Sequence, residues 1–220
     1  MTLVILSQIP TLNNVCVVSS RNTRSSGGEV IKICLEEIDR SRPYFVCSIG
    51  FRNGWALHPL DDPKASWVTL LDNTFDIGID AFPWVKEYRD RSVTELEILH
   101  GMLRPETRHL SPRSFVYMRS VQYLRSEVSA EQRGTYAEMG WAEQKLYDLK
   151  RSIIQAGFHI KFFDTPEQWA DMVKNDFITS LDKDFPVSQF SPLDLVRHYK
   201  TTSKIQSENC NMAIKYLYCC

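Results

Sequence analysis

The stretch that decides the fold is VIKICLEEIDRSRPYFVCSIG, which occupies residues 30–50. Its first half repeats apolar residues at the spacing of one helix face: Val30, Ile31, Cys34, Leu35 and Ile38. Pro43 ends this helix, because proline lacks an N–H group and disfavours helical backbone in the residue before it. Residues 44–49 are then a continuous apolar run, as expected for a strand covered on both faces. The stretch therefore predicts an amphipathic helix, a short turn and a buried strand.

A second informative stretch is SVTELEILHGML, residues 92–103. Ser92 and Glu95 have the spacing of a capping box, which marks the start of a helix. One face of this helix is apolar and carries Val93, Leu96, Leu99 and Leu103. The helix is expected to end before Pro105, and residues 114–118 read as the next strand.

Later residues continue the alternation of helix and strand. Ser129 with Gln132 predicts the start of a long helix that runs to about residue 155, and residues 159–163 follow as a strand. Thr165 with Gln168 predicts a last helix. Its expected buried side chains are Trp169, Met172, Val173 and Phe177. Residues 50–91 are expected to form a long, partly helical excursion over the top of the sheet.

This order of elements predicts an α/β fold. Helix–strand alternation builds a mostly parallel sheet with right-handed crossovers, flanked by helices in a flavodoxin-like or TIR-like three-layer sandwich. We expect an irregular segment over residues 1–28, in which residues 15–18 are a possible strand. The α/β domain then covers residues 29–190, and a linker with a divergent tail covers residues 191–220.

The composition narrows the class of protein. The 220 residues include 26 basic and 27 acidic side chains, a net charge of −1, so no overall field favours nucleic acid or an anionic membrane. No stretch approaches the ~18 uninterrupted apolar residues of a membrane span. The six cysteines and five histidines lack the spacing of a zinc site, and a reducing cytoplasm fits this cysteine usage best. We expect no cofactor and no metal.

Three segments together resemble a known family. They are CLEEIDRSRPYFVCSIGFRNGW at residues 34–55, SVTELEI at residues 92–98 and SFVYMR at residues 114–119. The resemblance is to the N-terminal domain of nephrocystin-3-like and tetratricopeptide-repeat STAND proteins, and it covers about residues 29–198. In that family the domain precedes a NACHT nucleotide switch and TPR repeats.

The resemblance implies a protein-interaction or effector module without enzymatic activity. Its expected partners are the NACHT–TPR region of relatives or a second copy of itself. The family's usual first strand is not found in residues 1–28, and residues 201–220 depart from the family. The resemblance therefore suggests a truncated or alternatively spliced form.

The alternative is a TIR-like NAD or nucleotide glycohydrolase, and its catalytic candidate is Glu97. In NAD-cleaving TIR domains a glutamate before isoleucine on the matching helix contacts the ribose, and Glu97 occupies that place by resemblance. A carboxylate near a developing oxocarbenium ion stabilises it. Leu96 and Leu99 are expected to face the core, so Glu97 should project from the other side. The structural alternative is an acid favoured by the helix dipole.

Candidate ligand-binding residues follow the first strand: Gly50, Arg52, Gly54 and Trp55. Ligands of α/β sheets bind beyond the carboxyl ends of strands, and Arg52 could contact an anion there. The loop lacks the lysine and hydroxyl residue of a P-loop. Its structural interpretation is a tight turn with Trp55 packed over the sheet edge.

Overall fold

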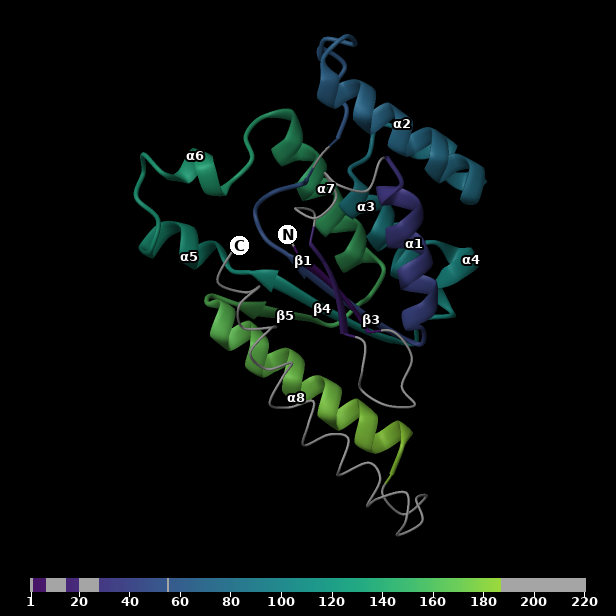
Figure 1. Cartoon of the computed structure of the whole chain (residues 1–220). Helices are drawn as coiled ribbons and strands as arrows, with labels where there is room; N and C mark the ends of the chain where they lie inside the picture. Colours follow the sequence, from purple (N-terminus) through teal and green to yellow (C-terminus); the bar gives the residue numbers. More distant parts are fainter. Residues whose placement is uncertain (1, 7–14, 20–27, 55, 187–220) are drawn as a thin grey trace.

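The computed structural model describes residues 2–6, 15–19, 28–54 and 56–186 (Figure 1). Trp55 and residues 187–220 lie outside the described residues, as does part of the N-terminal segment. The strands are β1 (Thr2–Leu6), β2 (Val15–Ser19), β3 (Tyr44–Ile49), β4 (Arg113–Arg119) and β5 (Ile160–Phe163). The larger helices are α1 (Val30–Ser41), α2 (Ser66–Ala81), α3 (Val93–Ile98), α7 (Trp141–Gln155) and α8 (Pro166–Asp184). The shorter helices are η2 (Pro83–Tyr88), η3 (Leu99–Leu103), α4 (Pro105–Arg108), α5 (Val121–Ser126) and α6 (Arg133–Tyr136).

The strands form one sheet in the order β2-β1-β3-β4-β5. β3, β4 and β5 are parallel, so the predicted α/β class is confirmed for these three strands. β1 pairs antiparallel with both β2 and β3. Both N-terminal strands lie within residues 1–28: β2 coincides with the possible strand predicted at residues 15–18, whereas β1 at Thr2–Leu6 was not predicted. The domain limits, and the likeness to flavodoxin or TIR folds, stay predictions.

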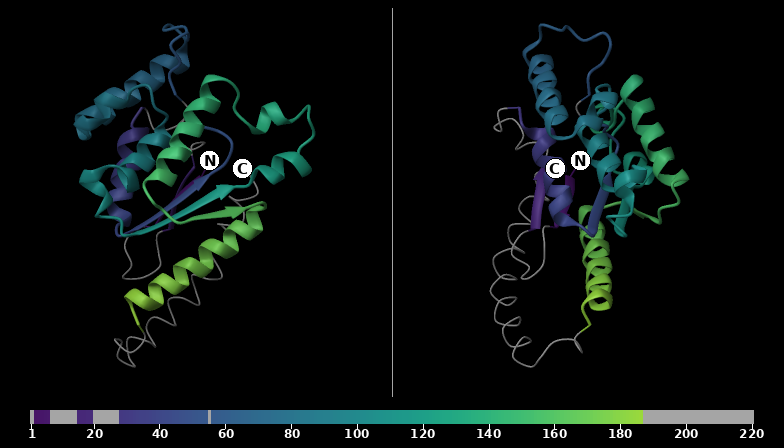
Figure 2. Two further views of the ribbon diagram at one scale, coloured as in Figure 1. Left: turned by 180° about the vertical axis from the view of Figure 1, so that it is seen from behind. Right: turned by 90° about the vertical axis from the view of Figure 1, so that its right-hand side faces the viewer.

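Alternate side chains of the parallel strands enter two separate cores, because successive side chains of a strand point to opposite faces. Phe45, Cys47 and Ile49 of β3 pack with apolar residues of α1, α3 and α7. Tyr44 and Val46 of the same strand belong to a smaller cluster that includes residues of α8. Figure 2 shows α8 on one face of the sheet and the other large helices on the opposite side.

Helix α8 is fastened to its face of the sheet by polar contacts as well as by aromatic packing. Its N-cap is Thr165, whose side chain accepts a hydrogen bond from the Gln168 N–H, as predicted. The Tyr44 hydroxyl donates to Asp184 at 2.8 Å, and the Tyr117 hydroxyl donates to Asp176 at 2.7 Å. These buried tyrosines therefore satisfy their hydroxyl groups on the helix that covers them.

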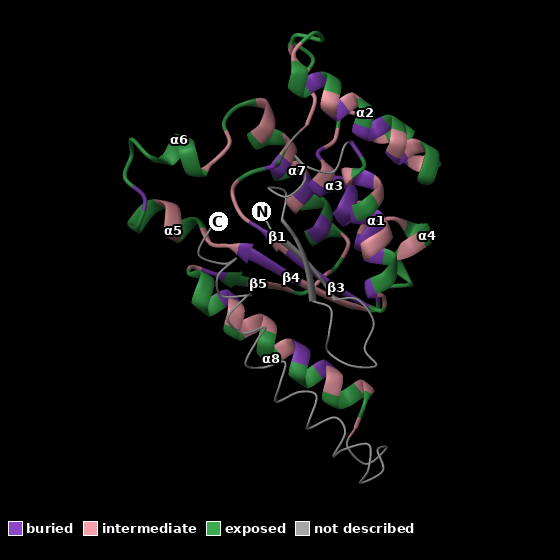
Figure 3. Ribbon diagram, in the orientation of Figure 1, coloured by how far each residue is buried: buried purple, intermediate pink, exposed green. Residues whose placement is uncertain are grey.

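The helix predicted between residues 129 and 155 is broken. α6 ends at Tyr136, and α7 begins only after Gly140, which has a φ of +63° that favours glycine. Between them the Glu138 N–H donates to the carbonyl oxygen of Phe51 at 2.9 Å. The chain thus leaves the helix to contact the loop after β3. Figure 3 shows that α5 and α6 are largely exposed, and neither of these short helices has a buried residue.

Candidate functional site at the carboxyl edge of the sheet

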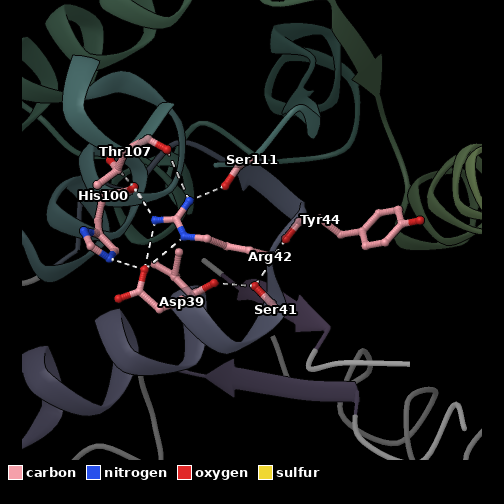
Figure 4. A network of polar contacts seen from close by, with 8 residues as sticks. Asp39, Ser41, Arg42, Tyr44, His100, Thr107 and Ser111 are labelled. Atoms are coloured by element: carbon pink, nitrogen blue, oxygen red, sulfur yellow. Dashed lines mark hydrogen bonds and ion pairs between the residues drawn. The ribbon is translucent and has the colours of Figure 1, made fainter. Parts of the chain in front are cut away.

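Polar residues of the 30–50 stretch form a network of contacts at the amino-terminal end of β3 (Figure 4). This is the end of the strand opposite to the loop of residues 50–54. Arg42 donates to the Ser111 hydroxyl at 2.6 Å and to the Thr107 carbonyl at 3.3 Å. It also donates to Asp39 at 3.0 Å, and the same Asp39 oxygen lies 2.9 Å from Nε2 of His100. These contacts join α1 to η3, α4 and the segment before β4. The most recognisable part of the sequence therefore holds the fold together.

The π-helical turn η3 approaches β3 closely at a glycine. A Cβ atom at Gly101 would lie 2.2 Å from the Phe45 ring, so a larger residue cannot fit without a shift. The neighbouring His100 ring is buried and lies parallel to the Trp84 ring, with the centroids 5.8 Å apart. Because η3 directly follows α3, this close packing also fixes the position of α3, which carries the predicted catalytic residue Glu97.

The loop at the carboxyl end of β3, residues 50–54, is held by α6, by the chain between α6 and α7, and by α7 itself. Nζ of Lys150 donates to the Gly50 carbonyl at 2.7 Å. Arg52 donates to the Thr135 carbonyl at 2.8 Å, and its Nε lies 3.4 Å from the Glu138 carboxylate. Burial lowers the pKa of Lys150. Arg52 keeps about half of its side-chain surface exposed, so it remains accessible to an anion.

The other end of the loop rests on the start of α3. Gly54 has a φ of +87°, and a Cβ atom there would lie 3.2 Å from Oγ1 of Thr94. Ser92 caps α3 by accepting a hydrogen bond from the Glu95 N–H at 3.1 Å. The reciprocal contact of the predicted capping box is not among the described hydrogen bonds, because the Glu95 carboxylate instead accepts from Arg91 at 2.6 Å.

Glu97 is buried, which corrects its predicted projection away from the core. Five of the six residues of α3 are buried and Val93 is half-buried, so Glu97 has no solvent-exposed face to project from. Burial raises the pKa of Glu97 to about 7, although a hydrogen bond with Cys34 of α1 opposes the shift. Burial, and to a lesser degree the Glu97 charge, raises the pKa of the Cys47 thiol of β3. The carboxyl group therefore points between α1 and β3.

Four charged groups meet where α3 begins beside α7. Arg91 pairs with the buried Glu95, and Lys145 of α7 pairs with Asp90. Burial raises the pKa of Glu95, against the opposing charge of Arg91. The two cations balance the two anions, so the group carries no net charge. The sequence did not predict this charged group. Glu95 was interpreted as part of a capping box, and Lys145 lies fifty residues further along the chain.

Asn53 is a second residue that sequence reasoning missed. It is 1% exposed, and neither its amide nitrogen nor its amide oxygen has a hydrogen-bond partner. Asparagine is common in turns, so nothing in the sequence distinguishes it from a turn residue.

The structure brings some of the predicted site residues together and separates others. Gly50, Arg52 and Gly54 share the loop at the carboxyl edge of β3, where ligands of α/β sheets bind. The described contacts of Glu97 are with α1 and β3, and those of Arg52 are with the chain before α7. Trp55 lies outside the described residues.

The described part of the chain offers neither a metal-binding cluster nor a membrane-spanning helix. No group of three or more histidine, cysteine, aspartate or glutamate side chains there could hold a metal ion. In the same residues, no helix is both long and apolar enough to cross a membrane.

The fold and its edge loop define an α/β domain with helices on both sheet faces. A TPR repeat-containing protein of Dictyostelium discoideum is 33% identical over 171 residues, which cover 77% of this chain and 10% of the relative. Tetratricopeptide repeat protein 41 of Rattus norvegicus is 25% identical over 172 residues, 72% of this chain and 13% of the relative. A putative human protein of the same name is 23% identical over 169 residues, 72% of this chain and 12% of the relative.

The chain is thus related to TPR-repeat proteins through one segment of them. It spans about a tenth of the length of these relatives. No protein-family model and no solved structure matches the chain.

Proposed function

We propose that this chain is a protein-interaction module of a TPR-repeat scaffold protein and acts in the cytoplasm without enzymatic activity. One observation carries the proposal: about three quarters of the chain matches a small segment of much longer TPR-repeat proteins. Stacked helical repeats of this kind form extended surfaces that bind proteins. In the finer form of the proposal, the module precedes a NACHT nucleotide switch and responds to its assembly.

An exposed apolar rim near the edge loop is the surface that we assign to the partner. Leu60 and Met139 are 87% and 77% exposed. The Leu60 N–H donates to Nδ1 of His58, whose ring packs edge-on against Trp141 at 4.8 Å, two residues after Met139. Exposed apolar groups gathered from two segments are typical of protein-binding sites. The partner that we assign is the TPR-bearing remainder of the longer protein.

A binding titration between the chain and the TPR-bearing region of a relative tests this proposal. We expect micromolar association, and the double variant Leu60→Asp with Met139→Asp should weaken it by roughly tenfold or more, because a charge replaces each apolar contact. The matched control is Ile178→Asp, which alters an exposed apolar residue of α8 on the other face of the sheet. No association, or equal weakening by the control, would refute the assigned surface.

The second candidate is a TIR-like NAD or nucleotide glycohydrolase that uses Glu97, with Arg52 contacting a phosphate. One observation favours it: a pKa of about 7 is suited to proton transfer at neutral pH. Release of nicotinamide from NAD, abolished by Glu97→Gln and retained by Glu106→Gln, would establish it. The absence of any release from the folded chain would exclude it for this chain.

A further inference from the structure

The sheet has an open edge at β5, the last strand in its order. The Ser120 N–H, just beyond β4, donates to the Phe163 carbonyl at 2.8 Å, so the backbone of Phe163 faces β4. Because backbone groups alternate in direction along a strand, the N–H and carbonyl of Phe162 face away from the sheet. Within the described residues no strand pairs with them. An unpaired edge of this kind is a template for a further strand.

The side chain of Phe162 adds an apolar group beside this edge. Phe163 belongs to the cluster under α8, whereas Ile160 packs against the cluster that includes residues of α7. Successive side chains of a strand point to opposite faces, so Phe162 lies on the same face as Ile160. Its register partner on β4, Met118, is buried, but Phe162 itself is 58% exposed. The core therefore ends before the Phe162 ring.

Helix α7 has exposed apolar residues on the flank nearer to β5. Ile153 is fully buried and marks the face of α7 that packs on the sheet. At about 100° per residue, Lys145 lies about 80° to one side of Ile153, and there it pairs with Asp90 before α3. Tyr147 and Ile154 lie about 100–120° to the other side, and they are 60% and 56% exposed. This second flank faces away from α3, on the side of the edge strand into which α7 leads.

The charges of this flank are complementary to themselves about Tyr147. Glu143 lies four residues before Tyr147 and Arg151 four residues after it, and all three are exposed. When two α7 helices lie antiparallel with their Tyr147 rings together, each Glu143 meets Arg151 of the other copy. Tyr147 and Phe162 both lie near the middle of their elements, so one two-fold axis can pass both.

The spacing of strands and helices also fits a second copy. A helix that joins two neighbouring strands lies over the space between them, and α7 joins β4 to β5. Neighbouring strands are about 4.8 Å apart, so pairing two β5 edges places the two α7 axes roughly 10 Å apart. Packed helices lie about 8–10 Å apart. A peptide strand on the same edge would leave the α7 flank uncovered.

We propose that two copies of this chain form a dimer through the β5 edge and the outer flank of α7. The two Phe162 residues exchange N–H···O bonds, as opposite residues of an antiparallel pair do. At about 200 Å² for a large side chain, Phe162, Tyr147 and Ile154 expose roughly 350 Å² in each copy. This is over a third of the about 800 Å² that each partner buries in a standard interface. The dimer is independent of the association with a TPR region proposed above.

Sedimentation equilibrium of the unaltered chain between about 1 and 300 µM tests the proposal. We expect a monomer–dimer equilibrium with a Kd in the micromolar range. Phe162→Lys should raise this Kd by roughly tenfold or more, because a charge on an edge strand opposes pairing. The matched control is Ile33→Asp at a partly exposed apolar residue of α1, which packs beside β1 and β3. A monomer at every concentration, or equal weakening by the control, would overturn the proposal.

Exchanging charges tests the antiparallel contact of the two helices. Glu143→Arg and Arg151→Glu should each raise the Kd by roughly tenfold, because the two-fold axis repeats each like-charge pair. An equimolar mixture of these two variants should recover the original Kd, since both contacts then join opposite charges. Thermal unfolding of each variant alone shows that it is folded. A mixture that associates no better than its components would overturn the proposal.

Amide hydrogen exchange tests the pairing of the strands. Exchange of the Phe162 N–H should slow as the concentration of the chain rises through the Kd, because the partner strand then accepts its hydrogen bond. The same rate at low and high concentration would place the interface elsewhere. If the chain stays monomeric and Phe162→Lys instead weakens binding of the TPR-bearing region, the surface belongs to that region and the proposed dimer is wrong.

Discussion

Replacing Glu97 by glutamine should stabilise the protein at neutral and alkaline pH. The pKa of Glu97 is raised from its ordinary 4.5 to about 7, because burial between α1 and β3 disfavours the charged form. The folded state therefore binds a proton that the unfolded state releases between these two pH values. The contribution of Glu97 to stability is complete below pH 4.5, declines as the pH rises to about 7, and is absent above it. Glutamine removes this decline, since it cannot ionise.

The expected magnitude follows from the two pKa values. At 1.36 kcal/mol for each pH unit, the interval from 4.5 to about 7 corresponds to about 3 kcal/mol. The free energy of unfolding of Glu97→Gln should thus exceed that of the unaltered chain by up to about 3 kcal/mol at pH 8, less any cost of repacking. At pH 4.5 the two proteins should differ little, because Glu97 is then protonated in the folded state.

Urea unfolding of both proteins at several values between pH 4.5 and 8 measures this difference. Subtracting one curve from the other removes the titration of all other groups. The control is Glu106→Gln, because the pKa of this exposed carboxyl is lowered by hydrogen bonds from its own backbone N–H and from Arg104, which gives any effect the opposite sign. A difference that does not change with pH, or a Glu97→Gln variant that is less stable at pH 8, would show that Glu97 is not buried as described.

Two further predictions concern the packing around η3 and α1. Gly101→Ala should destabilise the fold by about 1–3 kcal/mol in urea unfolding, because its Cβ would lie 2.2 Å from an aromatic ring of β3. Gly134→Ala, where nothing lies within 4 Å, should change stability by no more than about 0.5 kcal/mol, and equal effects would contradict the close approach. Arg42→Lys should cost about 2 kcal/mol, because an ammonium group cannot reach the several acceptors of the planar guanidinium. Arg40→Lys, at an exposed side chain, should leave the free energy of unfolding almost unchanged. If Arg42→Lys also leaves it unchanged, the Arg42 network does not contribute to stability.

Local sequence patterns correctly predicted those helices and strands whose apolar spacing matches the face that they bury. α1, β3 and α8 appear where the apolar spacing, Pro43 and the Thr165 cap placed them. The prediction of one long helix over residues 129–155 was wrong. The helix is interrupted before Gly140, where the chain contacts the loop after β3. Helical periodicity could not predict this break, since the contact joins residues far apart in the chain.

The candidate site shows the same division. The sequence located the loop of residues 50–54, because a glycine-rich turn after a buried strand is a local signal. It misjudged Glu97, since α3 is so short and so enclosed that polar residues are buried on every side. It gave no sign that Asn53 is buried, or that Gly54 lies close to Thr94. No spacing along the chain reveals that contact.

The Arg42 network has a consequence for how relatives of this chain are recognised. Its side chains join α1, η3 and α4 at the amino end of β3, whereas the edge loop lies at the strand's other end. Asp39 and Arg42 therefore serve the architecture at this end of the sheet and take no part in the loop at the other end. Likeness to another protein in these residues alone would indicate a shared architecture, and the ligands of each protein would have to be determined separately.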